Sequence, residues 1–157
     1  MQSLIEEAKI INGLSPASRN SAASGDWVSM ENYDKVTFVI SVGAVTTGGN
    51  VLIQEAKTAA GGSAATLNFD YYHKMTASTD TYTKTSANTA SSADCITVGN
   101  SSDNKIFVVE IRATQLSSGF KFVNVKTPAA FSAALTSVVG IAHKARYAQS
   151  APPTALV

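Results

Sequence analysis

The feature of this sequence that most constrains its fold is a series of short β-branched and aromatic runs separated by turn residues. Residues 36–42, 51–57 and 106–112 are rich in Val, Ile and other strand-forming residues. Turn signals such as Gly48-Gly49-Asn50 recur about every 8–12 residues, as they do in two-sheet β proteins. The pattern predicts an all-β chain folded as a two-sheet antiparallel β-sandwich. It leaves open whether the topology is that of a jelly roll or an immunoglobulin-like domain.

Weaker signals predict the remaining strands. Residues 67–72 alternate apolar and polar side chains, which indicates a half-buried strand. Residues 135–147 are predicted as a long strand rather than a helix, because β-branched residues dominate their centre. Shorter strands are expected at 81–85, 96–98 and 120–125. The predicted core comprises Phe38, Ile40, Leu52, Phe69, Phe107, Val109, Ile111, Phe122 and Val139.

The first 24 residues differ from the rest of the chain. Large apolar residues near Leu4 and Ile11 share one face of a short predicted helix that ends at Gly13. Residues 15–24 are small and polar, and cannot build a core of their own. The segment predicts an extended N-terminal arm that grips a neighbouring subunit, although a frayed terminus without a role is an equal alternative.

The predicted organisation therefore has three parts. Residues 1–24 form the arm, residues 25–148 the β-sandwich domain, and residues 149–157 a C-terminal tail stiffened by Pro152-Pro153. No secretory signal and no membrane-spanning helix are expected, because no apolar stretch approaches the ~20 residues that a membrane helix needs.

The charge of the chain is low and nearly balanced. Twelve basic residues oppose eleven acidic ones, and charged residues make up 15% of the sequence, against about 25% in typical globular domains. Neither nucleic acid nor another polyanion is indicated as a partner, and no membrane contact is expected. A weakly charged surface of small side chains suits lasting contact with other subunits, and a soluble monomer is the alternative.

Candidate catalytic residues are few. His73 and His143 are far apart in the sequence, and each precedes a lysine that would repel a bound metal ion. The sequence has no Gly-x-Ser-x-Gly motif and no phosphate-binding loop. Cys95 is the only cysteine, which excludes an internal disulfide, and it is predicted to be a buried apolar residue. We therefore expect no enzymatic activity, no cofactor and no metal.

One segment resembles a known class of proteins. Residues 25–33 read Gly-Asp-Trp-Val-Ser-Met-Glu-Asn-Tyr, and Val-Thr-Phe-Val-Ile follows at 36–40. This pattern resembles a segment of small virion structural proteins of tailed bacteriophages, and weaker similarity extends to Val125. The resemblance implies a decoration or cement protein on the capsid surface of the virion, made in the host cytoplasm. Its partner would be the major capsid protein, and a homotrimer is the simplest arrangement at threefold lattice positions.

The residues predicted to bind the partner are large apolar side chains in the arm and at the start of the sandwich: Leu4, Ile5, Ile10, Ile11 and Trp27. Two alternative functions stay open. The first is another virion component, namely a tail tube, head–tail adaptor or fibre protein. The second is a carbohydrate-binding module, which would require exposed, coplanar aromatic rings. Burial of Trp27 and Tyr33 would count against that second alternative.

Overall fold

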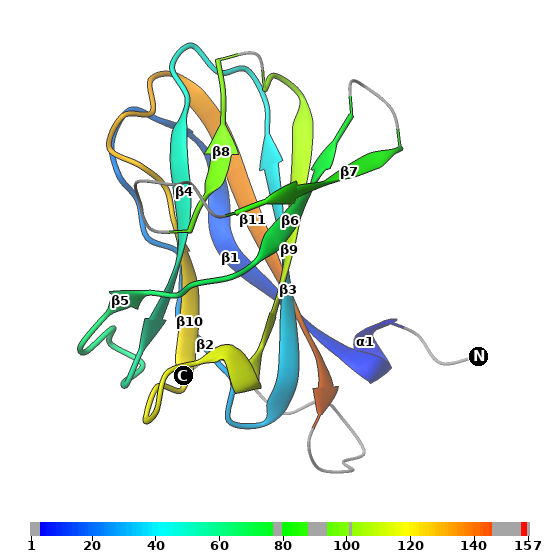
Figure 1. Cartoon of the computed structure of the whole chain (residues 1–157), viewed down its shortest axis with the longest axis vertical. Helices are drawn as coiled ribbons and strands as arrows, with labels where there is room; N and C mark the ends of the chain where they lie inside the picture. The colour runs from blue at the N-terminus through cyan, green and yellow to red at the C-terminus, as the bar shows by residue number, and fades with distance from the viewer. Residues whose placement is uncertain (1–3, 77–79, 88–93, 101, 146–154, 157) are drawn as a thin grey trace.

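The computed structural model describes the chain except for residues 1–3, 77–79, 88–93, 101, 146–154 and 157. Two antiparallel sheets pack face to face, which confirms the predicted all-β sandwich (Figure 1). The elements, in chain order, are α1 (Leu4–Glu7), β1 (Ala8–Arg19), β2 (Val28–Ser29), β3 (Tyr33–Val42), β4 (Gly49–Ala56), β5 (Ala65–Thr66), β6 (Tyr71–Met75), β7 (Tyr82–Ser86), β8 (Ile96–Val98), β9 (Lys105–Arg112), the 3₁₀ turn η1 (Ala113–Gln115), β10 (Phe122–Lys126) and β11 (Ala134–Ala145).

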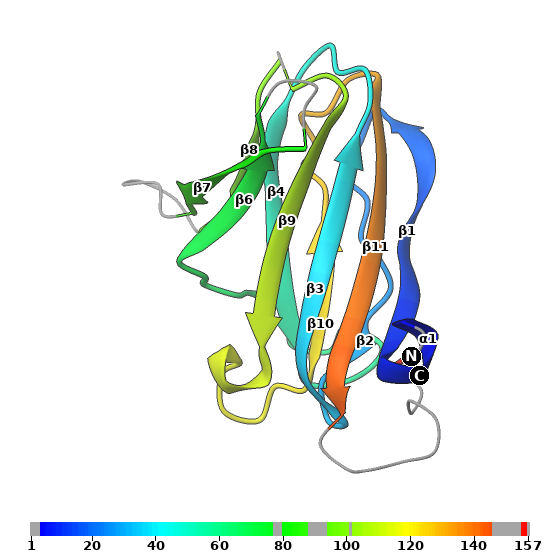
Figure 2. The ribbon, with the colours of Figure 1, turned by 90° about the vertical axis from the view of Figure 1, so that its right-hand side faces the viewer.

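The larger layer is a six-stranded sheet with the order β1-β11-β3-β9-β6-β7. Its centre is β3, which pairs with β11 on one side and β9 on the other. In β3 every second residue from Val36 to Val42 points into the core, as expected for a strand with one face on the sandwich interior. Figure 2 looks onto the outer face of this sheet, with the second sheet behind it.

The smaller layer is a five-stranded sheet that contains β2, β10, β4 and β5 in that order, with β8 pairing with β4. Its strand β4 matches the predicted strand after the turn at Gly48-Gly49. Gly48 is required there, because any side chain would collide with the backbone of Val98 on β8. Glycine at this position therefore allows β4 and β8 to pair closely within the smaller layer.

The predicted core is largely confirmed. Seven of the nine residues are buried: Phe38, Ile40, Phe69, Phe107, Val109, Ile111 and Phe122. The prediction is wrong for Leu52, which is half-buried, and for Val139, which is 38% exposed. In both cases an adjacent residue, Val51 or Val138, faces the core instead. Strands that are apolar at successive positions do not reveal which face points inward.

The predicted N-terminal arm is wrong for its central part. Residues 8–19 form β1, an edge strand that pairs with β11 from Ala8 opposite His143 to Arg19 opposite Ala134. Ile11 is 2% exposed and packs in the core of its own chain. The helix is shorter than predicted, since it ends at Glu7. The sandwich therefore begins at about residue 8, not at residue 25.

The composition of this segment explains the error. Ser, Asn and Pro are poor strand formers, and β1 accommodates them with register shifts between Asn12 and Leu14 and between Leu14 and Ala17. Such β-bulges and a proline are typical of edge strands. Pairing with β11 and the packing of its inward apolar side chains hold the strand in place. Neither interaction can be read from the local sequence.

The described part of the predicted C-terminal tail also contacts the sandwich. Ala155 is fully buried, and its carbonyl oxygen accepts a hydrogen bond of 2.7 Å from the backbone nitrogen of Ser29. Leu156 forms a bridge with Val28. The rest of the tail, residues 149–154 and 157, lies outside the described residues.

Candidate functional site: the outer face of the six-stranded sheet

The outer face of the six-stranded sheet carries most of the large apolar side chains that are exposed. Six of the seven found among the described residues lie on this face or on α1 beside it: Leu4, Ile10, Tyr71, Tyr82, Leu135 and Val139. Cross-strand pairs arrange these and neighbouring apolar residues in two adjacent rows: Ile10 lies opposite Ile141 in one row, and Val139 opposite Val39 in the other. Val39 in turn lies opposite Val108.

Residues that are directly opposite in antiparallel strands share one face of the sheet. Together the two rows cover parts of four neighbouring strands, β1, β11, β3 and β9. We call this surface the apolar face and define it by the following residues: Ile10, Val39, Val108, Leu135, Val139 and Ile141. All six are exposed or half-buried, so the sheet's own chain leaves them in contact with water.

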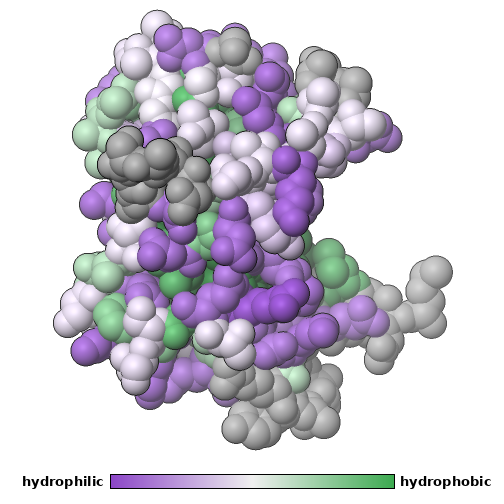
Figure 3. All heavy atoms as spheres, viewed as in Figure 1, coloured by the Kyte–Doolittle hydropathy of each residue, from purple (hydrophilic) through white to green (hydrophobic). Residues whose placement is uncertain are grey.

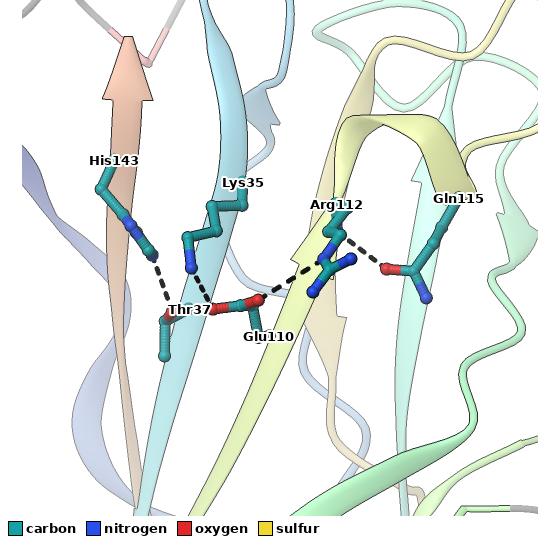
Figure 4. A network of polar contacts seen from close by, with 6 residues as sticks. All are labelled: Lys35, Thr37, Glu110, Arg112, Gln115 and His143. Carbon is teal, nitrogen blue, oxygen red and sulfur yellow. Dashed lines mark hydrogen bonds and ion pairs between the residues drawn. The ribbon is translucent and has the colours of Figure 1, made fainter.

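A row of polar residues follows the apolar face at the end of the sheet nearest α1 and η1 (Figure 4). Lys35 Nζ lies 2.6 Å from Glu110 Oε2, and Arg112 Nε lies 3.7 Å from Glu110 Oε1. On the other side of β3, Thr37 Oγ1 and His143 Nε2 are 3.0 Å apart. These contacts link β11, β3 and β9 across the sheet, because Lys35 lies opposite both His143 and Arg112.

The charge states in this polar row follow from its geometry. The hydrogen bond from Lys35 holds the pKa of Glu110 below its ordinary value. Burial, reinforced by the positive charge of Lys35, lowers the pKa of His143. At neutral pH Glu110 is therefore ionised and His143 is neutral, which suits the contact of His143 with the Thr37 hydroxyl.

Two hollows flank the polar row. The α1 groove, of about 500 Å³, lies between α1 and β11 and is lined by Leu4, Ala8, Ile141 and His143, among others. The polar hollow, of about 290 Å³, lies where β6, β9 and η1 meet and is lined by Asp70, Tyr71, Glu110, Arg112, Thr114 and Gln115, with Phe69 at its base. Figure 3 shows this side of the molecule recessed between the β6–β7 hairpin and α1, with hydrophobic surface next to α1.

The structure separates the five residues that the sequence predicted to bind a partner. Leu4 and Ile10 are 54% and 47% exposed beside and on the apolar face. Ile11 is in the core, and the side chain of Ile5 lies outside the described residues. Trp27 is half-buried against Gly61, in the loop after β4, on the other layer of the sandwich. Only two of the five therefore share an exposed surface.

Sequence reasoning missed most of the apolar face. Val39, Val108 and Val139 belong to strands that the sequence identified, but these strands carry apolar residues at both alternating positions. Such a run is also typical of a strand buried on both sides, so the sequence does not show that one side of these strands is open to solvent. The available signal was the repeated occurrence of two-sided apolar runs in a sequence that predicts only one short helix, too little to cover an outer face.

Within the described ranges, no three His, Cys, Asp or Glu residues gather as they would around a metal ion. Over the same part of the chain, no helix has the length and apolar character to cross a membrane. Cys95 is 1% exposed, as predicted, and lies just before β8. Tyr33 is fully buried, so Trp27 and Tyr33 do not form an exposed aromatic platform.

Comparison with known proteins identifies a shared fold. No protein-family model matches the sequence, and no curated protein matches it. Among solved structures, the SPBc2 prophage-derived protein YomS matches with a TM-score of 0.50 and 12% sequence identity. The match covers 88% of this chain and 94% of YomS. At this identity the similarity shows that the two proteins share their overall fold.

Proposed function

We propose that this protein is a structural virion protein of a tailed bacteriophage that binds the outside of the capsid as a decoration or cement protein and stabilises the head. The observation that carries the proposal is the apolar face, which this chain leaves uncovered. The resemblance of residues 25–125 to small phage virion proteins supports it. So does the fold shared with a prophage-derived protein.

The apolar face suits a broad contact with the capsid shell. Protein interfaces are depleted of charge at their centre and carry polar groups at their rim. Here the apolar residues lie on β1, β11, β3 and β9, and the polar row of Lys35, Glu110 and Arg112 lies at one end of the sheet. Each large aliphatic side chain moved from water into such an interface contributes about 1.5–3 kcal/mol before ordering costs.

The remaining parts of the proposal concern assembly and chemistry. We place the major capsid protein on the apolar face and a homotrimer at threefold positions of the lattice. The protein acts by binding and not by catalysis, and it needs no cofactor, nucleic acid or membrane. Leu4 and Ile10 are the residues of the original partner-binding set that this contact would use.

A matched pair of charge insertions tests the proposal. Val139→Lys places a charge on the apolar face. Asn50→Lys places the same charge at an exposed position of β4, on the other sheet. Both positions are exposed, so each variant should fold with a stability within about 0.5 kcal/mol of the parent. Val139→Lys should bind capsids at least about tenfold more weakly in co-sedimentation, because it buries an unpaired charge. Asn50→Lys should bind normally.

Equal capsid binding by the two variants would overturn the assignment of this face to the shell. Light scattering of the free protein then separates the roles of the surface. If Val139→Lys also converts a trimer to a monomer, the face joins copies of this chain instead. Imaging of labelled particles distinguishes a lattice-wide decoration protein from a tail tube, a fibre or a single adaptor ring.

A further inference from the structure

The polar hollow is a second surface feature beside the apolar face, and it shares Glu110 and Arg112 with the polar row at the rim of that face. It lies where β6 begins and β9 ends, beside η1. Its volume of about 290 Å³ is close to the lower end of the range of about 300–1,000 Å³ for small-molecule sites. It therefore suits one small ring-shaped ligand or the end of a longer chain.

One wall of the hollow is the aromatic ring of Tyr71, which is 42% exposed. Two neighbours hold this ring in place. Lys84 Nζ on β7 lies 3.7 Å from the ring centroid, and the His73 ring meets it edge-on at a centroid distance of 5.5 Å. An exposed aromatic ring held by its neighbours offers an apolar surface at little entropic cost, because it does not need to be ordered again when a ligand binds.

The opposite wall consists of polar groups that are already positioned. The Gln115 carboxamide oxygen accepts a hydrogen bond of 2.8 Å from the backbone nitrogen of Arg112. This bond orients the carboxamide and does not use the amide nitrogen of Gln115. Glu110 is held between Lys35 and Arg112 at the distances given above. The side chain of Arg112 is 66% exposed, so its guanidinium keeps donors available to a ligand.

The charges around the hollow nearly cancel. Asp70 and Glu110 contribute two negative charges, Arg112 and the adjacent Lys35 contribute two positive ones, and Lys84 adds a third positive charge against the Tyr71 ring. A phosphate or carboxylate ligand would meet two carboxylates, and a cation would meet the basic groups. A neutral ligand with many hydroxyl groups is repelled by neither the carboxylates nor the basic groups. It can donate to the carboxylates and accept from the guanidinium and the amide, while its apolar ring face packs on Tyr71.

We propose that the polar hollow binds a neutral saccharide, with one sugar ring packed against Tyr71 and its hydroxyl groups bonded to Asp70, Glu110, Arg112 and Gln115. This site differs from the carbohydrate-binding surface considered from the sequence, because it uses Tyr71 and not Trp27 or Tyr33. It lies to one side of the apolar face and is lined by none of the six residues that define that face.

Titration of the full-length protein with neutral sugars tests the proposal. The probes are the methyl glycosides of glucose, galactose and N-acetylglucosamine, each added up to about 100 mM to detect weak binding. We expect at least one probe to shift backbone amide NMR signals of residues 69–71 and 110–115 in a saturable manner. Tyr71→Ala should weaken that binding about tenfold or more. Arg112→Ala, at an exposed side chain, provides a second variant.

Tyr82→Ala is the matched control, because Tyr82 is 44% exposed on the same hairpin but does not line the hollow. It should leave the affinity within about twofold of the parent. Absence of a saturable shift with all three glycosides, or equal loss in both tyrosine variants, would overturn the proposal. A response to inorganic phosphate but not to the glycosides would identify an anion site instead. Tyr71→Ala should still bind capsids, so the two proposals can fail independently.

Discussion

The two outer faces of the sandwich differ in how much of each the chain itself covers. On the five-stranded sheet, the outward-facing Asn124 is fully buried and Phe122 is 7% exposed. On the six-stranded sheet, the corresponding surface exposes Leu135 by 49% and Val139 by 38%. The same chain thus covers β10 on one side of its fold, the closed side, and leaves an apolar surface exposed on the other, the open side.

Specific contacts accompany the closed side. Asn124 Nδ2 donates a hydrogen bond of 3.2 Å to the carbonyl oxygen of Gly25, and the Trp27 indole packs against Gly61 in the loop after β4. The N-terminal segment could in principle have covered the other sheet. Instead, β1 extends that sheet sideways by pairing with β11 and adds Ile10 to its exposed surface. The difference between the two faces therefore follows from the path of the chain. This difference supports an external partner for the open side.

The largest expected effect concerns β1, whose position decides how wide the open face is. Deletion of residues 1–24 removes one of the two strand partners of the long strand β11, together with the buried Ile11 and Leu14. Burial of these two side chains alone contributes about 1.5–3 kcal/mol each, a large part of the 5–15 kcal/mol that stabilises a typical domain. We expect the deletion variant to lose its cooperative thermal unfolding transition in circular dichroism.

Two neighbouring residues provide the control for this deletion. Ile11→Ala should destabilise the protein by about 2–5 kcal/mol, whereas Ile10→Ala should change stability by less than about 0.5 kcal/mol. Ile10→Ala should instead weaken capsid binding. A deletion variant that unfolds like the parent would show that β1 is not part of the folded unit, and the open face would then be one strand narrower.

The next effect concerns the closed side. Gly61 has a φ of 78°, and a Cβ there would lie 2.7 Å from Trp27 Nε1. Gly61→Ala should therefore destabilise the protein by about 1–3 kcal/mol through backbone strain, with a further cost from displacing the indole. Because Trp27 is the only tryptophan, its fluorescence should shift to the red as the ring becomes exposed. Capsid binding should not change.

Gly119→Ala separates the two causes. Gly119 has a similar φ of 82° but no atom within 4 Å of an added Cβ. It should show the backbone cost of about 1–2 kcal/mol without the change in fluorescence. Equal stability losses and unchanged fluorescence in both variants would mean that the Trp27–Gly61 contact does not help to close this face.

The contrast between the faces also shows what the sequence could and could not reveal. The strands β3, β4, β9 and β11 were predictable, because β-branched runs between glycine-rich turns favour strands in any context. The strand β1 was not, since its Ser-, Asn- and Pro-containing sequence becomes a strand only through pairing with a segment more than a hundred residues away. Tertiary pairing of this kind leaves no local signal.

The candidate site depended on the orientation of side chains within strands. The sequence placed Val139 in the core and Tyr71 on the same side as Phe69, but Val139 and Tyr71 point outward. Tyr71 departs from the alternation because β6 begins there, whereas Phe69 precedes the strand. Irregular connections change the alternation, and only three-dimensional pairing fixes it. The pattern of two-sided apolar strands was the one signal that pointed to an uncovered face.

The smallest expected effect concerns the polar row at the edge of the open face. Burial and the positive charge of Lys35 lower the pKa of His143 below its ordinary value of 6.5. The charged groups around it come from every neighbouring element: Lys35 on β3, Glu110 on β9, Lys144 on β11 and Glu7 on α1, which lines the same groove.

The sign of the pH dependence follows from this lowered pKa. As pH falls through about 6.5, His143 takes up a proton first in the unfolded chain, so the folded state loses stability relative to it. The loss levels off once the pH passes the lower pKa of the folded protein. Glu110 acts in a separate window, because its stabilising contact with Lys35 is lost only as pH falls below its ordinary value of 4.5.

Urea unfolding between pH 7.5 and pH 5, bracketing the reference pKa of 6.5, should therefore show decreasing stability. The decrease should be at most about 1 kcal/mol for partly exposed charges of this kind. His143→Gln should remove the contribution of His143 to the change of stability with pH. His73→Gln, at the second histidine, should leave that contribution unchanged. An identical slope in His143→Gln and the parent would show that His143 is as free to take up a proton when folded as when unfolded. The polar row would then be an ordinary solvated strand end, and only the apolar face would distinguish this side of the molecule.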